Sequence, residues 1–228
     1  MTQVNFVVDC SGSMGATAAT WKGYKFARFE VMRTVIATAL NSMKGGDKVC
    51  IVEFESNAST LVPPTKYLAD VQMLLTSYGS GSEMALYPRG GTNIPAGMKE
   101  AFKNADKKDK NITFVITDMW DPNGDYISHA LNADCGNGDS CFKALADLGP
   151  VHVIVIGDRN SKIQMEKGCK GLNKLVSQDY GINWDGCFSV PLGDLGSLGY
   201  FNKLIYEFTD HYGTLSLGPE RQHTRQPY

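Results

Sequence analysis

The 228-residue sequence lacks the features of membrane and nucleic-acid proteins. No apolar run approaches the roughly 20 residues needed to span a bilayer. The first residues lack a basic region followed by an apolar stretch, so we expect no signal peptide. With 22 Lys and Arg against 24 Asp and Glu, the net charge is −2. This balance gives no sign of a nucleic-acid partner.

Cysteine and histidine are also sparse. None of the six cysteines stands in C-x-x-C spacing, and Cys10 and Cys50 lie in or beside apolar, strand-like runs. Free thiols in a cytoplasmic protein are therefore favoured over a disulfide set. Cys135 and Cys141 flank a short polar loop and are the pair most able to bridge. The four histidines do not pair with a cysteine at ligand spacing, which disfavours a zinc site.

Strand-like and helix-like segments alternate along the chain. The apolar pattern predicts strands at 4–8, 48–54, 58–61, 111–117, 151–156 and 187–191, and helices at 24–43, 68–75, 94–105, 142–148, 163–176 and 198–212. We expect Pro63-Pro64 to break the chain after 58–61, a short antiparallel edge partner. The runs at 112–117 and 151–156 are apolar without alternation, as in buried parallel strands. The prediction is an α/β fold with a doubly wound, mostly parallel sheet and helices on both faces. A single domain would cover 1–217, with a polar tail at 218–228.

Three polar side chains follow the first strand. Asp9, Ser11 and Ser13 alternate in sequence, so an extended backbone can aim their oxygens into one pocket. A carboxylate with two hydroxyls suits a hard divalent cation such as Mg²⁺. Aspartate and serine also form turns and cap helices, and Ser13 or Thr17 could cap the next helix. The segment alone leaves both interpretations open.

Two further oxygen-bearing residues occur at equivalent places. Asp118 follows the strand 111–117, and Thr92 follows Gly90-Gly91 just before the helix expected from residue 94. In a parallel sheet the carboxyl ends of the strands share one edge, where ligands bind. We therefore expect one site at this edge, made by Asp9, Ser11, Ser13, Thr92 and Asp118.

This pattern resembles the von Willebrand factor A (VWA) family and its metal-ion-dependent adhesion site (MIDAS). The family has Asp-x-Ser-x-Ser after the first strand, a threonine in a middle loop and an aspartate after the fourth strand. Here the matching segments are Asp9-Cys10-Ser11-Gly12-Ser13, Gly-Gly-Thr92-Asn and Val-Ile-Thr-Asp118. The likeness covers residues 3–212 in element order. It departs at Met119-Trp120-Asp121, where members commonly have glycine, and in the long loop 77–91; both leave the partner open.

The resemblance implies a Mg²⁺ site, with Mn²⁺ or Ca²⁺ possible, that binds without catalysis. In the family the two serines and the threonine coordinate the ion directly and the aspartates act largely through water. An open position is filled by a partner's aspartate or glutamate. The implied function is a non-enzymatic, Mg²⁺-dependent protein-binding module, a cytoplasmic adaptor in a multi-protein assembly. Intracellular relatives commonly serve AAA+ ATPases, tellurium-resistance-type stress systems or the Ro ribonucleoprotein.

Two other functions compete with this one. A phosphatase- or receiver-like enzyme could use Asp9 as nucleophile or metal ligand, but it would need a second aspartate at position 11, which is Ser11. A structural component of a larger particle could use the fold only for packing, although such a protein need not retain all five site residues.

Other polar and aromatic residues lie near the expected site. A solvated loop is favoured for Asp121, Asp125 and His129, and turn chemistry for Asp134, Asn137 and Asp139, which no glutamate closes into a calcium loop. Tyr87 and Trp120 flank site loops, as partner contacts or as half-buried packing residues.

Overall fold

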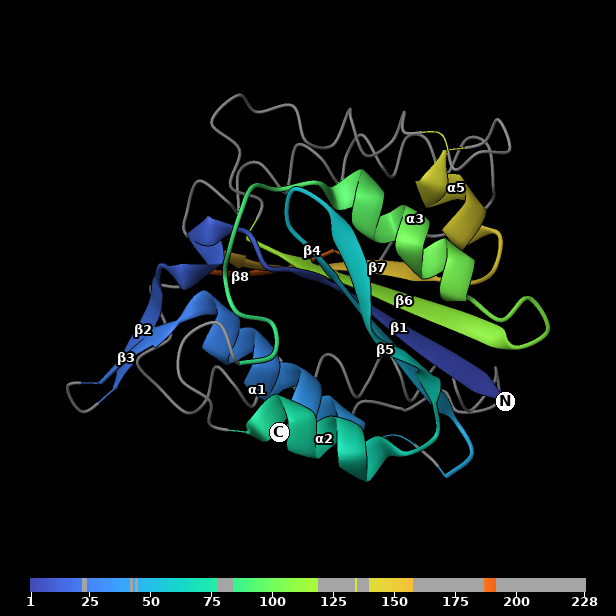
Figure 1. Ribbon diagram of the computed structural model, residues 1–228, viewed down its shortest axis with the longest axis horizontal. Helices are drawn as coiled ribbons and strands as arrows, with labels where there is room; N and C mark the ends of the chain where they lie inside the picture. Colours follow the sequence, from blue (N-terminus) through green and yellow to red (C-terminus); the bar gives the residue numbers. More distant parts are fainter. Residues whose placement is uncertain are drawn as a thin grey trace, which may run out of the picture.

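The computed structural model describes residues 1–21, 24–41, 43, 45–77, 84–118, 134, 140–157 and 187–191. Its main feature is a six-stranded sheet in the order β5-β4-β1-β6-β7-β8 (Figure 1). The strands are β1 (Thr2–Asp9), β4 (Lys48–Phe54), β5 (Ala58–Thr65), β6 (Lys110–Thr117), β7 (Val151–Gly157) and β8 (Cys187–Pro191). Every neighbouring pair is parallel except β4 and β5, which run antiparallel.

β1 lies inside this sheet, between β4 and β6. All eight of its residues are buried, because strands cover both of its edges and helices cover both of its faces. A strand in that place needs an uninterrupted buried run, as found here. The predicted fold class, a mostly parallel sheet with helices on both faces and one antiparallel edge strand, is confirmed.

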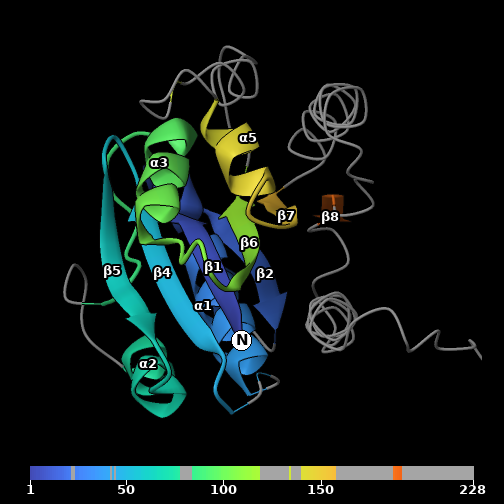
Figure 2. The same ribbon diagram turned by 90° about the vertical axis from the view of Figure 1, so that its right-hand side faces the viewer.

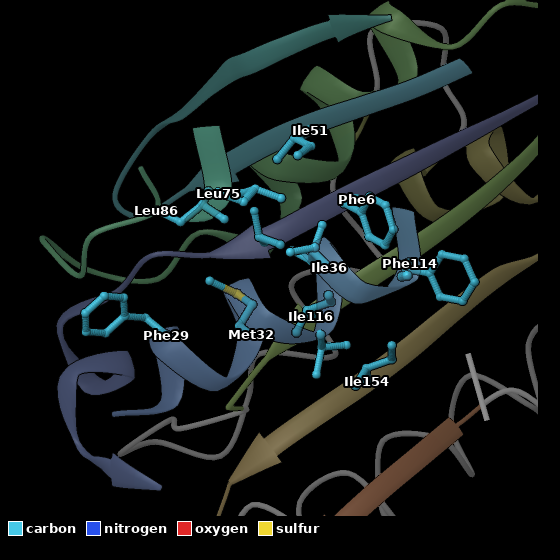
Figure 3. Close-up of a cluster of buried hydrophobic side chains, with 14 of the residues drawn as sticks. Phe6, Phe29, Met32, Ile36, Ile51, Leu75, Leu86, Phe114, Ile116 and Ile154 are labelled. Atoms are coloured by element: carbon cyan, nitrogen blue, oxygen red, sulfur yellow. The ribbon is translucent and has the colours of Figure 1, made fainter. Parts of the chain in front are cut away.

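The helices divide between the two faces. α1 (Arg28–Leu40) and α2 (Leu68–Thr76) cover one face, and α3 (Ile94–Asn104) and α5 (Cys141–Ala146) cover the other (Figures 1 and 2). Figure 3 shows the cluster under α1, where Met32 and Ile36 lie close to the strands. In that cluster Phe6 and Phe114 of adjacent strands stack with their ring centroids 5.8 Å apart. Among the described residues, no helix has the length and apolarity to cross a membrane.

The helix predicted at 24–43 is wrong at its start. Residues before Arg28 form an antiparallel hairpin of β2 (Thr17–Trp21) and β3 (Tyr24–Ala27), and the helix runs from Arg28 to Leu40. The carboxylate of Glu30 accepts a hydrogen bond from the Ala27 amide at 2.7 Å, which satisfies a donor at the helix end as in a capping box. The sequence pattern missed this boundary because the apolar residues of the hairpin continue the helical spacing.

Pro63-Pro64 also lies differently from the prediction. The pair does not end the edge strand but sits inside β5, which extends to Thr65. Both prolines are exposed and fall where the register with β4 is irregular, between Val62 and Thr65. Proline is tolerated there because an outer edge needs no ladder donor.

Smaller differences concern element ends. The helix expected at 142–148 spans Cys141–Ala146, and that expected at 94–105 ends at Asn104. The helices expected at 163–176 and 198–212 and the tail at 218–228 lie outside the described residues, so these and the single-domain boundary stay predictions.

Candidate metal centre

The carboxyl ends of β1, β4 and β6 meet at one edge of the sheet. Asp9 ends β1 opposite Phe54, the last residue of β4. On the other side Val8 pairs with Ile116, and Asp118 directly follows β6. The parallel register therefore brings the two predicted aspartates to neighbouring strand ends.

Asp9 is held by two hydrogen bonds. One carboxylate oxygen accepts from the Ser11 amide at 2.8 Å, and the other accepts from the Thr117 hydroxyl at 2.6 Å. The side chain is fully buried. Burial, followed by repulsion from Asp118, raises the pKa of Asp9 to about 6, although the hydrogen bonds from Ser11 and Thr117 act in the opposite direction. A nearby cation would stabilise the ionised form of this buried carboxylate.

The loop after β1 places two hydroxyls together. Ser11 is extended, at φ −63° and ψ 158°, and is followed by a short 3-10 turn, η1 (Gly12–Gly15). The hydroxyl oxygens of Ser11 and Ser13 lie 3.0 Å apart. The capping alternative is wrong, since Ser13 lies in this turn, Thr17 begins β2 and α1 starts only at Arg28.

The segment that carries Thr92 is bound to the same loop. The Arg89 amide donates to the Cys10 carbonyl at 2.6 Å, and the Gly12 amide donates to the Gly90 carbonyl at 3.2 Å. Gly90 has φ +64°, and an added Cβ would collide with the Glu55 carboxylate, so only glycine suits this approach. Thr92 itself is half-buried, next to Gly91 in the segment that leads into α3.

Ser56 and Asn93 fasten this segment further. The Gly91 amide donates to the Ser56 hydroxyl at 2.9 Å, and the Asn93 amide group donates to the Ser56 carbonyl at 3.2 Å. Asn93 also caps α3 by accepting from the Ala96 amide at 3.1 Å. Thr92 thus stands between two anchored residues at the edge of the sheet.

Asp118 is fully buried and bears an ion pair that the sequence did not suggest. The Arg28 guanidinium donates to one of its carboxylate oxygens at 2.7 Å. Arg28 was missed because its contact spans 90 residues of sequence. Thr117 was missed as well, although a threonine directly before Asp118 in a buried strand was a readable signal.

The residues present fit a hard cation. Two buried aspartates, the Ser11 and Ser13 hydroxyls and the nearby Thr92 segment supply oxygen atoms alone, which Mg²⁺ and Mn²⁺ prefer. Within the described ranges, no cluster of three His, Cys, Asp or Glu side chains could hold a metal. A cation at this edge would therefore depend on hydroxyls as well as carboxylates.

The remaining candidates lie apart from this cluster or outside the described residues. Tyr87 packs edge-on against Phe29, with ring centroids 5.7 Å apart, and is half-buried. Asp134 forms an isolated bridge with Ser140. The rest are not described: Trp120, Asp121, Asp125, His129, Cys135, Asn137 and Asp139.

The family model of the von Willebrand factor type A domain matches residues 4–120. No curated protein matches the chain by sequence. The solved structure of BatB from Bacteroides thetaiotaomicron is 19% identical, with a TM-score of 0.59 over 94% of this chain and 100% of that one. The aerotolerance-related membrane protein from Bacteroides fragilis is 17% identical, with a TM-score of 0.56 over 92% and 100%.

A pilus protein shares the fold too. The PilB minor pilin from Streptococcus sanguinis is 16% identical, with a TM-score of 0.61; the match covers 96% of this chain and 63% of the pilin. At these identities the likeness concerns the fold alone.

Proposed function

Because the chain belongs to the von Willebrand factor type A domain family, whose members are often protein-interaction modules, we propose that it binds a partner protein through Mg²⁺. The bound carboxylate would come from an aspartate or glutamate of that partner. The Ser11, Ser13 and Thr92 hydroxyls would hold the ion, with Asp9 and Asp118 behind them, largely through water. Mn²⁺ or Ca²⁺ could take the same place.

The observation that carries this proposal is the pair of buried aspartates beside two hydroxyls 3.0 Å apart. The aspartates attract a divalent cation, and the neutral hydroxyls leave its charge incompletely compensated. A carboxylate from outside then gains strong attraction in a partly desolvated site. The ion would supply this attraction, and the Ser11 and Ser13 hydroxyls would hold it at the carboxyl ends of the strands.

The geometry gives less support to an enzyme. Von Willebrand factor type A domains are generally non-enzymatic interaction modules. Asp9 is fully buried, and each of its carboxylate oxygens already accepts a hydrogen bond. A nucleophile in a phosphatase-like reaction would need one of these oxygens to face the substrate.

We infer a cytoplasmic adaptor in a multi-protein assembly, with an AAA+ ATPase or a ribonucleoprotein among the partners to test first. A membrane protein and a pilin share the fold. The fold itself therefore does not select a location.

Calorimetric titration tests the metal site directly. Mg²⁺, Mn²⁺ and Ca²⁺ would be added to the wild type and to a Ser11→Ala/Ser13→Ala variant. A matched control, Ser59→Ala/Ser77→Ala, removes two exposed hydroxyls, one on the outer strand β5 and one directly after α2. We expect the wild type and the control to bind and the site variant to lose binding. Equal binding by all three would contradict the proposed site.

Capture of a partner protein tests whether the bound metal mediates protein binding. Proteins retained by the immobilised wild type in Mg²⁺ should be released by a chelator and absent from the Ser11→Ala/Ser13→Ala column. Retention that survives both treatments would show binding through another surface.

A further inference from the structure

Arg28 occupies a position that helix stability does not favour. It is the first residue of α1, where the helix dipole is positive and a cationic side chain is unfavourable. Its side chain is only 8% exposed, so it is also largely removed from water. The contact that compensates for this placement is the ion pair with Asp118, at 2.7 Å.

This ion pair is incompletely satisfied. The Arg28 Nε atom is buried and has no hydrogen-bond partner among the described residues. A buried guanidinium is stabilised best when all its donors are used, and an orphaned donor weakens the arrangement. Arg28 is therefore bound to Asp118 by charge more than by a full set of hydrogen bonds. Such a pair can be exchanged for another cation at lower cost than a saturated one.

We propose that Arg28 is a built-in competitor for the metal, one that neutralises Asp118 when no divalent ion is bound. This inference rests on the proposed function, since it concerns the same site. Arg28 brings one positive charge to a corner that holds two carboxylates, whereas Mg²⁺ brings two. An ion bound beside Asp118 and the guanidinium would repel each other, so binding of one would weaken the hold of the other.

Arg28 lies where the β2–β3 hairpin ends and α1 begins. The Arg28 amide donates to the Ala16 carbonyl at 3.0 Å, and β3 ends at the preceding residue, Ala27. Figure 1 shows the β2–β3 hairpin standing off the main sheet beside the start of α1. An Arg28 side chain displaced by the metal would thus be released at the base of the hairpin, where its charge would be free to contact a bound partner.

Metal titration of Arg28 variants tests the proposal. Arg28→Gln removes the charge, and Arg33→Gln is the matched control, because Arg33 is also buried on α1 but donates to the Leu75 and Ser77 carbonyls instead. Calorimetry should show Mg²⁺ binding at least about tenfold tighter for Arg28→Gln than for the wild type, a gain of about 1.4 kcal/mol. Arg33→Gln should bind as the wild type does. Unchanged or weaker binding by Arg28→Gln would overturn the competition.

A measurement on the wild type covers the case in which Arg28→Gln does not fold. Arginine side-chain NMR signals of the ¹⁵N-labelled protein would be recorded with and without saturating Mg²⁺, and Arg28→Lys would assign the Arg28 signal. We expect Mg²⁺ to shift the Arg28 Nε–H signal and to leave that of Arg33 in place. An unmoved Arg28 signal in the metal-bound protein would overturn the proposal.

The two proposals fail in different ways. If the wild type binds Mg²⁺ and Arg28→Gln binds no tighter, the competition is wrong and the metal site stands. If neither protein binds any divalent ion, the metal site itself is wrong and the role of Arg28 falls with it. If only Arg28→Gln binds, the competition stands and the proposed Mg²⁺-dependent binding by the wild type is wrong.

Discussion

Asp9 and Asp118 are two carboxylates enclosed at the same strand ends, and they are compensated differently. Asp118 has a guanidinium against it, whereas Asp9 has only the neutral donors of Ser11 and Thr117. Neutral donors offset a buried charge less well than a cation does. Asp9 is consequently the residue through which the metal-free site should respond to pH.

Stability of the metal-free protein should fall as pH rises from about 4 to about 6. The unfolded chain releases the Asp9 proton near 3.8 and the folded chain near 6, so the folded state holds more protons between these values. Excess protons on the folded state mean that the free energy of unfolding decreases with pH. The loss should reach about 3 kcal/mol, at 1.4 kcal/mol per pKa unit.

Urea unfolding across this pH range measures the effect, after removal of metal by dialysis. Asp9→Asn is the comparison, because an amide retains an acceptor for the Ser11 amide and a polar partner for Thr117. The variant should lack this part of the pH dependence. A variant with the same slope as the wild type would assign the effect to another group.

Thr117→Val should destabilise the protein by about 1–3 kcal/mol, because it leaves one buried oxygen of Asp9 without its donor. Thr113→Val is the matched control on the same strand, since the Thr113 hydroxyl accepts only a long hydrogen bond of 3.5 Å from Asn5. Denaturant unfolding of both variants would show the larger loss at Thr117. Equal losses would mean that the Thr117–Asp9 hydrogen bond stabilises the protein no more than the Thr113–Asn5 one does.

Among the elements, α3 determines where the Thr92 segment can lie. Gly97 lets this helix approach the sheet closely, because a Cβ there would stand 2.6 Å from a Phe54 ring carbon and 2.9 Å from a Val7 methyl. The end of α3 that follows Thr92 is therefore held against the strand ends that form the site. A helix displaced outward would move this segment with it.

Gly97→Ala should destabilise the protein by about 1–3 kcal/mol through overpacking, even though alanine favours a helix over glycine by about 1 kcal/mol. Gly45→Ala is the control, because an added Cβ there meets nothing within 4 Å. Thermal melts of the two variants would separate packing from the general effect of the substitution. A more stable Gly97→Ala protein would show that helix and sheet have room to adjust.

The elements also show what sequence patterns can and cannot predict. The central strands were predictable because burial on both faces favours consecutive apolar residues, as at 6–8 in β1 and 114–116 in β6. The hairpin before Arg28 was not, since Phe26 suits a strand and a helical face equally well. The boundary depends on the carboxylate of Glu30 binding the Ala27 amide, a contact that side-chain periodicity does not encode.

For the whole molecule, bound metal should raise thermal stability by mass action. At Mg²⁺ a hundredfold above its Kd the folded state gains about 2.7 kcal/mol, which for a chain of this size corresponds to a rise in Tm of about 5–10 °C. Differential scanning calorimetry with Mg²⁺ or with chelator measures it. Asp9→Asn should show no rise; a rise equal to that of the wild type would place the ion elsewhere.

The overall arrangement of the site was predictable for a related reason. Parallel strands place their carboxyl ends at one edge, so Asp9 and Asp118 could be brought together from the strand pattern alone. Arg28 could not, because its contact with Asp118 joins a helix start to a strand end 90 residues away. Only the folded structure shows that Arg28 is the ion-pair partner of Asp118.

The exposed prolines of β5 protect one edge of the sheet from pairing with other chains at high protein concentration. β5 forms the outer border of the sheet, and an open border of peptide groups invites strands of other chains to pair with it, the first step toward fibrils. Pro63 and Pro64 offer no amide hydrogens there, and the irregular register around them bends the border away from a regular ladder. Copies of this chain are thereby hindered from pairing with one another along β5.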